Sequence, residues 1–386
     1  MRILQFTDAD VWAGTERLIL ELATGLRTAG VECVIASPPA SPLAVAAREK
    51  GLGTLDIPRR RFINRGAIVA IARLLRSGEI DILHCHNGRT ALHAAVARRI
   101  AGRGQLIMTQ HFLQPARCSR RGIARIASSL VHAWMSRQFD RVIAISDAVA
   151  QSMLERADLP ADRMVTVHNG ISPPDPRTLA NATEVRAGLA VADSSPMIFT
   201  AARLEREKDI ATLITAMSQV VQAVPAVRCF IAGDGRLRKE LQAQIELLRL
   251  QQSVSLLGHR NDALSLLNAA DVFVLPSPAE PFGLAILEAM ALAKPVIATR
   301  AGGPLEIVED NRTGLLVPPS NPTALADAII ALLGDIERAH SMGIAGRQRF
   351  ESRFTAEKMA RAVADVYAAC QPGLAVAPQR HMFSSP

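Results

Sequence analysis

Residues 280–288 read EPFGLAILE and place two carboxylates, Glu280 and Glu288, eight positions apart. An apolar stretch, Leu266–Leu275, precedes them, and the Leu, Ile, Ala and Met spacing over Gly283–Ala293 predicts a mostly buried helix. We therefore expect a strand, a loop that holds Glu280, and a helix that contains Glu288. The start of such a helix has free backbone N–H groups and a partial positive charge, which favour an anion such as a diphosphate.

The two carboxylates of this segment allow two interpretations. Beside an anion site, they can accept hydrogen bonds from the hydroxyl groups of a sugar. They would also fit an ordinary solvated surface next to a core helix, because acidic side chains are mostly exposed in proteins. The segment alone leaves both interpretations open.

Two cations follow another predicted strand. Arg203 and Lys208 lie five residues apart, after the apolar run Met197–Phe199 and before a helical pattern. Arg offers a planar fork of donors and Lys a compact charge, so the pair could hold one diphosphate at the carboxyl end of a strand. A solvated turn of alternating charge is the other interpretation.

Two glycine-rich turns also follow predicted strands. The strand that ends at Ala232 leads into Gly233-Asp234-Gly235, and Gly302-Gly303 with Glu306 follows the strand Pro295–Thr299. Glycine has no Cβ, so both turns would allow a ligand to approach the backbone. A Gly-Asp-Gly turn is also common where no ligand binds.

The first half of the chain shows the same alternation of strands and helices. Arg2–Phe6 form a short apolar strand, a loop with Gly14 follows, and the apolar spacing over Leu18–Leu26 predicts a helix. Another strand, Ile107–Gln110, ends at His111. Further strands are expected at Ile80–Leu83, Ile143–Ser146 and Val165–Val167.

His84, Cys85 and His86 raise the question of a metal site. Adjacent residues on an extended chain point to opposite faces, so only the two histidines share one. No second cluster supplies further ligands for a complete coordination shell. We therefore expect no metal site there.

The order and spacing of these motifs resemble the family-4 glycosyltransferases, retaining enzymes of the GT-B type. The resemblance implies an α/β fold of two Rossmann-like, doubly wound parallel-sheet domains that face a cleft. It implies that His111 and Glu280 contact the donor sugar, and that Arg203 and Lys208 hold its diphosphate. Glu288 would bind the nucleotide ribose. The other donor-binding residues that it implies are Gly14, Gly233, Gly235, Phe282, Gly283, Leu284 and Glu306.

This chain departs from the family pattern at one point. The family usually has two consecutive glycines after its first strand, where this chain has Ala13 and Gly14. The additional methyl group changes how closely a ligand can approach the backbone there.

The resemblance also implies a reaction, namely transfer of a sugar from a nucleotide-diphosphate donor to an acceptor hydroxyl, with retention at the anomeric carbon. It implies no cofactor, no metal and no protein nucleophile. It further implies a lipid-linked or glycan acceptor and a role in cell-envelope polysaccharide, lipopolysaccharide or glycolipid assembly. A sugar-nucleotide epimerase or hydrolase of the same fold and a non-catalytic sugar-nucleotide-binding subunit are the alternatives. The nucleotide, the sugar and the acceptor cannot be read from the chain.

The length predicts two domains. A chain of 386 residues with 49% hydrophobic content is long enough for two domains, each with its own core. The resemblance implies that 1–172 form an acceptor-binding domain and 173–370 a donor-binding domain, whose last helix can pack back on the first domain. The Pro-rich stretch 172–176 would link them. Residues 371–386 are polar and lack periodicity, which predicts a disordered tail.

Positive charge is concentrated in the first half. Residues 1–170 hold 23 Lys and Arg against 14 Asp and Glu, whereas 171–386 hold 21 against 22. One basic cluster contains Arg59, Arg60, Arg61 and Arg65, and a second contains Arg117, Arg120, Arg121 and Arg125 before the helix-like stretch 126–134. This pattern suits an anionic membrane surface, or a helix packed on its own domain with a solvated basic face. An aromatic content of 4% argues against nucleic acid as a partner.

The cysteines and the first residues indicate the compartment. Five cysteines are odd in number and widely spaced, which favours reduced thiols. The first eight residues carry charge and lack an apolar signal core, and no run of 18 apolar residues occurs. We therefore expect a cytoplasmic protein that can lie on the inner face of the cell membrane.

Overall fold

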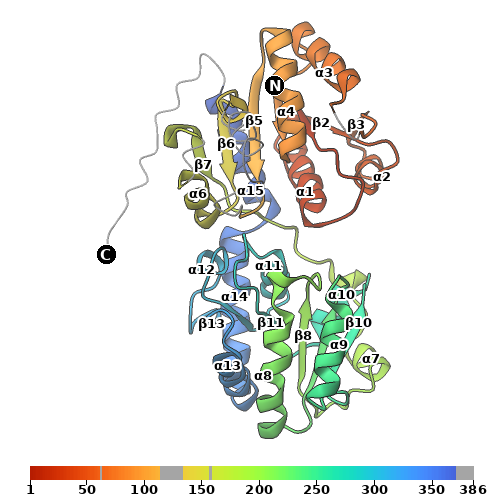
Figure 1. Cartoon of the computed structure of the whole chain (residues 1–386), viewed down its shortest axis with the longest axis vertical. Coiled ribbons are helices and arrows are strands. Elements are labelled where there is room, and N and C mark those ends of the chain that lie inside the picture. Colours follow the sequence, from red (N-terminus) through yellow and green to blue (C-terminus); the bar gives the residue numbers. More distant parts are fainter. Residues whose placement is uncertain (61–62, 114–133, 156–158, 371–386) are drawn as a thin grey trace, which may run out of the picture.

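The computed structural model describes residues 1–60, 63–113, 134–155 and 159–370. Figure 1 shows two α/β domains, the first in red to yellow at the top and the second in green to blue below. The described residues of the first domain form a seven-stranded sheet of order β3-β2-β1-β4-β5-β6-β7, and those of the second form a six-stranded sheet of order β10-β9-β8-β11-β12-β13. All named strand pairs are parallel. The expected two-domain, doubly wound fold is confirmed.

The first domain alternates strands and helices along the chain. Its strands are β1 (Arg2–Phe6), β2 (Glu32–Ser37), β3 (Gly53–Asp56), β4 (Ile82–Cys85), β5 (Gln105–Gln110), β6 (Arg141–Ala144) and β7 (Met164–Thr166). Its described helices are α1 (Gly14–Thr28), α2 (Pro42–Glu49), α3 (Arg65–Ser77), α4 (Gly88–Ala101) and α6 (Asp147–Leu154), with the 3₁₀ turn Ala161–Arg163. Side-chain caps begin several of these helices: Asn87 accepts from the Thr90 amide and Ser146 from the Val149 amide.

The second domain repeats the pattern. Its strands are β8 (Met197–Ala201), β9 (Arg228–Ala232), β10 (Val254–Gly258), β11 (Val272–Leu275), β12 (Val296–Thr299) and β13 (Gly314–Val317). Its helices are α7 (Ala182–Gly188), α8 (Ile210–Ala223), α9 (Arg238–Leu247), α10 (Ala263–Ala269), α11 (Leu284–Ala291), α12 (Pro304–Ile307), α13 (Pro322–Gly334), α14 (Ile336–Arg353) and α15 (Ala356–Ala369). Two 3₁₀ turns, Pro176–Thr178 and Arg206–Lys208, complete the described part.

The second sheet separates two hydrophobic layers because successive strand residues point to opposite faces. In β11, Val272 and Val274 join the layer under α8 and α13, whereas Phe273 and Leu275 join the layer on the other face. That second layer is continuous with the core of the first domain. Each domain was expected to have its own core, but one buried cluster runs through both.

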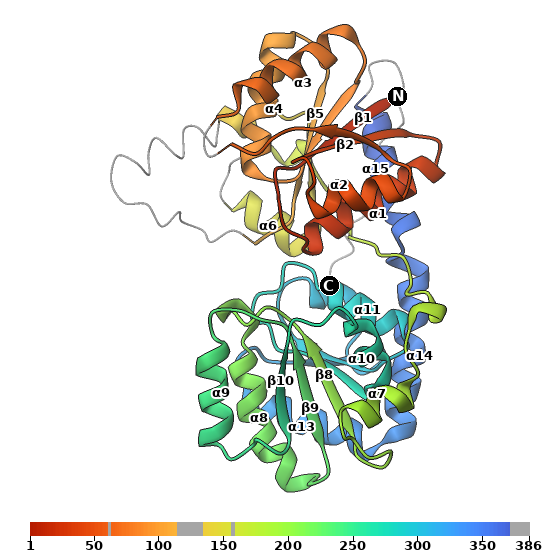
Figure 2. The same ribbon diagram turned by 90° about the vertical axis from the view of Figure 1, so that its right-hand side faces the viewer.

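The last helix returns to the first domain. Helix α15, in blue, lies beside α1 in both views of the molecule (Figures 1 and 2). The contact is close, because a Cβ added at Gly25 of α1 would lie 2.6 Å from the Ala360 Cβ. Where the chain crosses the boundary, Ile171 pairs in parallel with Thr355, so the outgoing and returning segments run side by side. The first domain is therefore completed by a segment from the far end of the chain.

One sequence expectation about an element was wrong, and others fall outside the described residues. The stretch Leu266–Leu275 does not form one strand, because its first part belongs to helix α10 and only Val272–Leu275 form β11. Apolar residues alone do not distinguish a buried helix end from a strand. Arg61, the second basic cluster and the tail at 371–386 lie outside the described residues. In the part of the chain that is described, no helix is long and apolar enough to cross a membrane.

Candidate active site

Lys208 and Glu280 meet at the carboxyl edge of the second sheet. Lys208 ends the 3₁₀ turn after β8, and Glu280 lies in the loop between β11 and α11. The Lys208 Nζ donates a hydrogen bond of 2.6 Å to the Glu280 Oε2, and the two side chains are only 19% and 10% exposed. A nearly buried charge pair that faces the domain boundary is costly to desolvate unless each charge has a partner. The pair predicted from sequence to hold the diphosphate and touch the sugar therefore forms one unit.

Arg203 is not part of this unit. Its guanidinium pairs with Glu207 of the same loop at 2.8 Å, and both side chains are largely exposed. An exposed pair of this kind is held weakly and exchanges readily with solvent. A role for Arg203 in holding a diphosphate stays a prediction that requires its release from Glu207.

The glycines of both turns are required by the packing of protein loops. A Cβ at Gly233 would lie 1.9 Å from the Ala202 carbonyl oxygen, and a Cβ at Gly235 would lie 2.4 Å from that of Leu204. In the same way, a Cβ at Gly303 would lie 2.3 Å from the Phe282 Cα. The expectation that these glycines leave room for a ligand therefore needs correction, because the protein's own backbone occupies the space. A donor contact through the amides of Gly233 and Gly235 stays a prediction.

Helix α11 points its amino end at the boundary. Gly283 precedes it with a φ of 117°, a left-handed conformation that favours glycine. The amides of Leu284 and Ala285 belong to the first turn of the helix, where N–H groups have no intrahelical acceptor. The side chain of Phe282 points elsewhere: it is 2% exposed and stacks on His168 with ring centroids 5.8 Å apart. Only the backbone of Phe282 is thus available to a ligand.

The first domain contacts helix α11 of the second domain at two residues. Arg17 of α1 forms an ion pair with Glu288 of α11. Nearby, a Cβ at Gly14 would lie 3.1 Å from the Leu284 Cδ1, so the first glycine turn packs on the start of α11. The residues predicted from sequence to bind the donor, Gly14, Leu284 and Glu288, are therefore neighbours across the domain boundary.

Glu306 connects the two domains at a second point. Its carboxylate accepts hydrogen bonds from the amides of Asp147 and Ala148, at 2.8 and 3.0 Å, and so binds the amino end of α6. The His168 Nε2 lies 2.8 Å from the same carboxylate. Asp147, His168 and Glu306 also have ligand atoms within 4.8 Å of one another, as in a cation site. Each Glu306 oxygen accepts from a backbone N–H of α6, so the three residues form a contact between the two domains.

His111 lies just after β5, in a buried cluster of histidines. Its Nε2 is 3.1 Å from the His86 Nδ1, and the His84 and His86 rings are 4.5 Å apart. Burial lowers the pKa of His111 to about 4 and that of His84 to about 3, and it holds the pKa of His86 well below its ordinary value. All three imidazoles are therefore neutral at physiological pH. Strand β5 neighbours β6, and Ser146, two residues after the end of β6, donates a hydrogen bond from its hydroxyl to the Pro281 carbonyl at 2.7 Å. His111 therefore lies on the edge of the first sheet that meets the second domain.

Sequence reasoning missed several of these residues. Gln5, Arg17 and Tyr367 were not identified, because each acts through a partner that is far away in the sequence: 271 positions separate Arg17 from Glu288, and 362 separate Gln5 from Tyr367. The alternation of β1 could indicate one of them, since Gln5 is a polar residue within an apolar strand.

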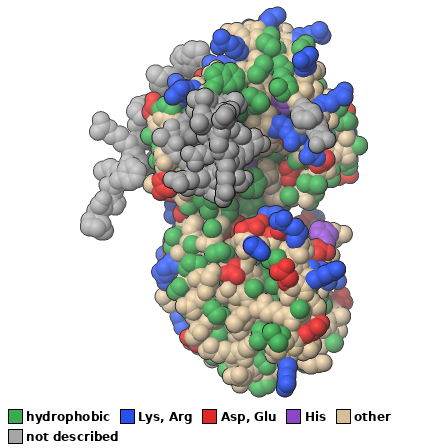
Figure 3. Space-filling model, in the orientation of Figure 1, with side chains coloured by type: hydrophobic (Ala, Val, Ile, Leu, Met, Phe, Trp, Pro, Cys, Tyr) green, Lys and Arg blue, Asp and Glu red, His purple; other side chains and the backbone are tan. Residues whose placement is uncertain are grey.

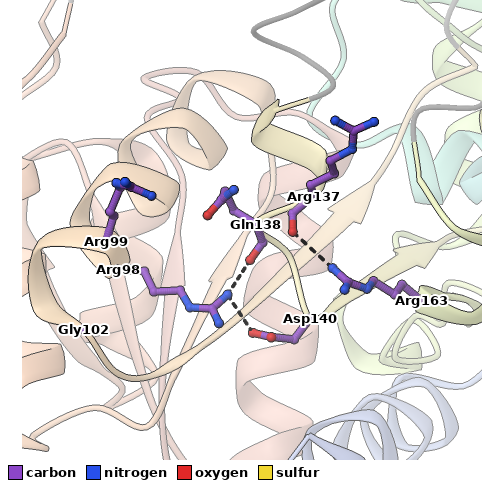
Figure 4. Close-up of a pocket in the computed structure, with 7 residues that line it drawn as sticks. All are labelled: Arg98, Arg99, Gly102, Arg137, Gln138, Asp140 and Arg163. Atoms are coloured by element: carbon purple, nitrogen blue, oxygen red, sulfur yellow. Dashed lines mark hydrogen bonds and ion pairs between the residues drawn. The ribbon is translucent and has the colours of Figure 1, made fainter.

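A separate hollow of about 370 Å³ lies at the opposite, amino edge of the first sheet. Four arginines surround it, Arg98, Arg99, Arg137 and Arg163. Figure 4 shows Arg98 and Arg163 reaching the loop before β6 from opposite sides, where they donate to the carbonyls of Gln138 and Arg137. The side chains of Arg99 and Arg137 form no hydrogen bond or ion pair with other described residues. The space-filling view in Figure 3 shows basic side chains, in blue, on other parts of the first domain as well.

Comparison with known proteins places these features in a family. Residues 12–174 match the family model described as Glycosyltransferase Family 4, and residues 181–349 match Glycosyl transferases group 1. The chain is 31% identical over 303 residues to glycogen synthase of Mycobacterium tuberculosis, covering 77% of this chain and 71% of that protein. It is also 31% identical over 306 residues to alpha-maltose-1-phosphate synthase of Mycolicibacterium smegmatis, covering 74% and 78%. The crystal structure of HepE from Anabaena in complex with UDP has the same fold, with a TM-score of 0.82 at 22% identity over 96% of this chain and 100% of that one.

Proposed function

The chain belongs to the group 1 glycosyltransferases, and we propose that it transfers a sugar, with retention at the anomeric carbon, from a nucleotide-diphosphate donor to an acceptor hydroxyl. Membership of the family makes the protein a glycosyltransferase. The stereochemistry, the donor, the acceptor and the site residues are the content of the proposal. Cell-envelope polysaccharide, lipopolysaccharide or glycolipid assembly is the proposed setting.

The buried Lys208–Glu280 pair supports this proposal most strongly. Negative charge develops on the diphosphate as the sugar departs, and a cation beside a helix amino end stabilises such charge. Lys208 and the first amides of α11 provide that combination at one edge of one sheet. Glu280, held by Lys208, has a second carboxylate oxygen with which to accept a hydrogen bond from a sugar hydroxyl.

The proposed reaction uses no protein nucleophile, metal or cofactor. The acceptor hydroxyl attacks the anomeric carbon on the face that the diphosphate leaves, and the departing phosphate oxygen takes the acceptor proton. The bond from sugar to phosphate breaks as the bond from sugar to acceptor oxygen forms, so configuration is retained. The protein supplies position and charge stabilisation.

The choice of nucleotide is open to a direct screen. HepE has been crystallised with UDP and with UDP-glucose, so uridine diphosphate is the first compound to test. A ligand that binds only the native state raises its thermal stability. We expect one of uridine, guanosine and adenosine diphosphate to raise Tm more than the other two. Equal shifts for all three would show that the protein does not select the base, and no shift with any of them would contradict a nucleotide-diphosphate donor.

Transfer assays test the site. Lys208→Ala and His111→Ala should both reduce sugar transfer, and Lys239→Ala, at an exposed position of α9, is the matched control. If the first two variants transfer sugar as well as the wild type does, the site assignment is wrong. Reversal of the anomeric configuration in the product, read by proton NMR, would reject retention.

Two other functions predict different outcomes in these assays. An epimerase or hydrolase of this fold would consume the sugar nucleotide when no acceptor is present. A non-catalytic binding subunit would be stabilised by the nucleotide but would turn nothing over. The transferase proposal predicts slow donor loss alone and faster loss when an acceptor is added.

The basic first domain supports a second partner, an anionic membrane surface. Arg99 and Arg137 are unpaired within the described residues and lie beside Arg98 and Arg163 at one hollow. Basic clusters of this kind attract anionic lipid headgroups, each residue near the surface contributing about 1 kcal/mol. A protein that lies on the cytoplasmic face of a membrane would there meet a lipid-linked acceptor, which is the acceptor class we propose. Nucleic acid is not proposed as a partner.

Vesicle binding tests the membrane proposal. Flotation with liposomes that contain phosphatidylglycerol should recover the wild type, and neutral phosphatidylcholine liposomes should not. Arg99→Gln combined with Arg137→Gln should lower recovery. Lys239→Gln combined with Arg347→Gln removes the same charge from the second domain and is the control. Recovery that does not depend on lipid charge would reject the proposal.

A further inference from the structure

A chain of buried hydrogen bonds leads from the last helix to His111. The Gln5 Nε2 donates to the Tyr367 hydroxyl at 2.8 Å, and the Gln5 Oε1 lies 2.5 Å from the His86 Nε2. The His86 Nδ1 in turn lies 3.1 Å from the His111 Nε2. Gln5 and His86 are at most 3% exposed, and His111 is 7% exposed. Water therefore does not compete for these bonds.

The orientation of the Gln5 amide determines the direction of the chain. A side-chain amide has two N–H hydrogens and one oxygen acceptor. On one side of Gln5 lie the Tyr367 hydroxyl, which accepts from the Gln5 Nε2 at 2.8 Å, and the Cys33 thiol. A hydrogen bond from Gln5 lowers the pKa of that thiol, against the larger effect of burial. On the other side lies only His86. The amide nitrogen therefore faces Tyr367, and its oxygen faces His86.

Proton positions follow from this orientation. An amide oxygen only accepts, so the His86 Nε2 carries a hydrogen. Because His86 is neutral, its Nδ1 is bare and accepts from the Nε2–H of His111. His111 is neutral as well, which leaves its Nδ1 without a hydrogen. The chain thus selects one of the two neutral tautomers of His111.

The bare nitrogen of His111 has no partner. Its Nδ1 is buried and forms no hydrogen bond to any described residue. A buried acceptor left unpaired costs about 1–3 kcal/mol, so a ligand that supplies a hydrogen is favoured there. Phosphate oxygens are acceptors and would be repelled, whereas a hydroxyl group can donate. His111 therefore favours a hydroxyl over the diphosphate.

We propose that Gln5 and His86 are positioning residues that hold His111 as its Nε2–H tautomer, so that its Nδ1 accepts a hydrogen bond from a hydroxyl of the transferred sugar. This inference rests on the proposed function, which places a donor sugar at His111. It adds the residues that determine which nitrogen faces the sugar. It also assigns a role to His84-Cys85-His86 other than metal binding, since His86 relays the orientation and His84 ties Tyr367 to Thr109 at 2.6 and 2.7 Å.

Histidine ¹⁵N chemical shifts test the tautomer without any ligand. In the wild type, His111 should show a protonated Nε2 and a bare Nδ1. In His86→Leu, which removes the acceptor, we expect a mixture of the two tautomers. A protonated Nδ1 in the wild type would overturn the inference whatever the activity of the protein.

Binding measurements test the consequence for the sugar. His86→Leu should weaken UDP-glucose about fivefold, the value of one neutral hydrogen bond, and change the Kd for UDP less than twofold. His86→Asn, whose Oδ1 can accept from His111, should restore UDP-glucose binding to within twofold of the wild type. Val366→Ala loosens α15 without touching the chain of hydrogen bonds and controls for packing.

The two failures can be told apart. Equal weakening of UDP and UDP-glucose by His86→Leu, or the same loss in Val366→Ala, would overturn the positioning role. If the wild type binds UDP and UDP-glucose equally and His111→Ala changes neither, the proposed contact of His111 with the donor sugar fails. The tautomer measured by NMR then still decides whether Gln5 and His86 orient His111.

Discussion

The two sheets share one strand order over six strands, but their carboxyl edges carry different chemistry. In the first domain, the edge holds neutral, buried imidazoles, represented by His86 and His111. In the second, it holds a charged pair, Lys208 and Glu280. A neutral edge can select hydroxyl groups, whereas a charged edge can stabilise a phosphate that leaves. The comparison shows that strand order determines where groups gather. It also shows that burial keeps the imidazoles neutral, whereas the equally buried Glu280 stays charged because Lys208 is its partner.

Acid should affect the two domains very differently. The folded-state pKa values of His84 and His111, about 3 and about 4, lie below the ordinary 6.5, so the unfolded chain binds protons that the folded protein excludes. Stability is then lost as pH falls from about 6.5 towards 4. At pH 5 the two residues together should lower the free energy of unfolding by about 4 kcal/mol relative to its value at neutral pH.

Fluorescence during urea unfolding can measure this loss in the first domain, because both tryptophans, Trp12 and Trp134, lie there. In His84→Gln, the free energy of unfolding should depend less steeply on pH than it does in the wild type. His340→Ala, at an exposed position of the second domain, should leave it unchanged. Stability that stays constant between pH 7 and 5 would show that the imidazoles are not held neutral.

Removing the positive charge of Lys208 from the carboxyl edge of the second sheet should have the next largest effect, and this effect is on catalysis. Lys208→Ala should lower kcat/KM for sugar transfer by about 100- to 1000-fold, the usual cost of losing a donor to developing negative charge. Steady-state kinetics with the donor selected by the thermal screen provide the measurement. A loss below tenfold would show that the leaving diphosphate is stabilised elsewhere.

Removing the neutral imidazole of His111 from the carboxyl edge of the first sheet should reduce catalysis less. His111→Ala should lower kcat/KM about tenfold, because a neutral hydrogen bond contributes roughly 1 kcal/mol and some positioning is lost with it. The same assay applies, with Lys239→Ala as the control. If His111→Ala proved more damaging than Lys208→Ala, the proposed division of roles between the edges would be reversed.

The smallest effect is expected where the two domains touch. Glu306→Gln keeps the shape of the side chain but removes the charge that faces the amino end of α6, at a cost of about 1 kcal/mol. The boundary should open more often, and the amides of Asp147 and Ala148 should exchange hydrogen about fivefold faster by mass spectrometry or NMR. Unchanged exchange would mean that Ser146 and the aromatic contact of Phe282 hold the boundary without Glu306.

Much of the architecture could be predicted from the sequence, for a physical reason. Parallel strands buried on both faces give apolar runs such as Phe273–Leu275, and these recur with helices between them. The fold expected from these runs is confirmed by the strand order of the two sheets. The family resemblance came from the motifs and is confirmed by the family models that match the chain. Leu266–Leu275 was misinterpreted because the helix end and the strand are both apolar and only two residues separate them, so that Asn268 and Asp271 did not mark the boundary.

The candidate site was less accessible to prediction, because its contacts join distant segments. Lys208 and Glu280 could be named from their motifs, and the structure brings them together. The exposed pairing of Arg203 with Glu207, the Arg17–Glu288 ion pair and the chain from Gln5 to His111 depend on tertiary neighbours. The turn glycines were interpreted as room for a ligand, since sequence does not reveal that another loop fills the space.

The return of α15 has a consequence for the order in which the protein can mature on the ribosome. Tyr367, at 0% exposure, is inserted between Gln5 and His84, and Ala360 covers Gly25. A nascent chain of 1–172 therefore exposes the apolar face of α1 that α15 covers, and it leaves Gln5 without its Tyr367 partner, until about 200 further residues have been translated. A chain that stops near position 356 would lack α15, so the domain that is synthesised first would lose part of its core.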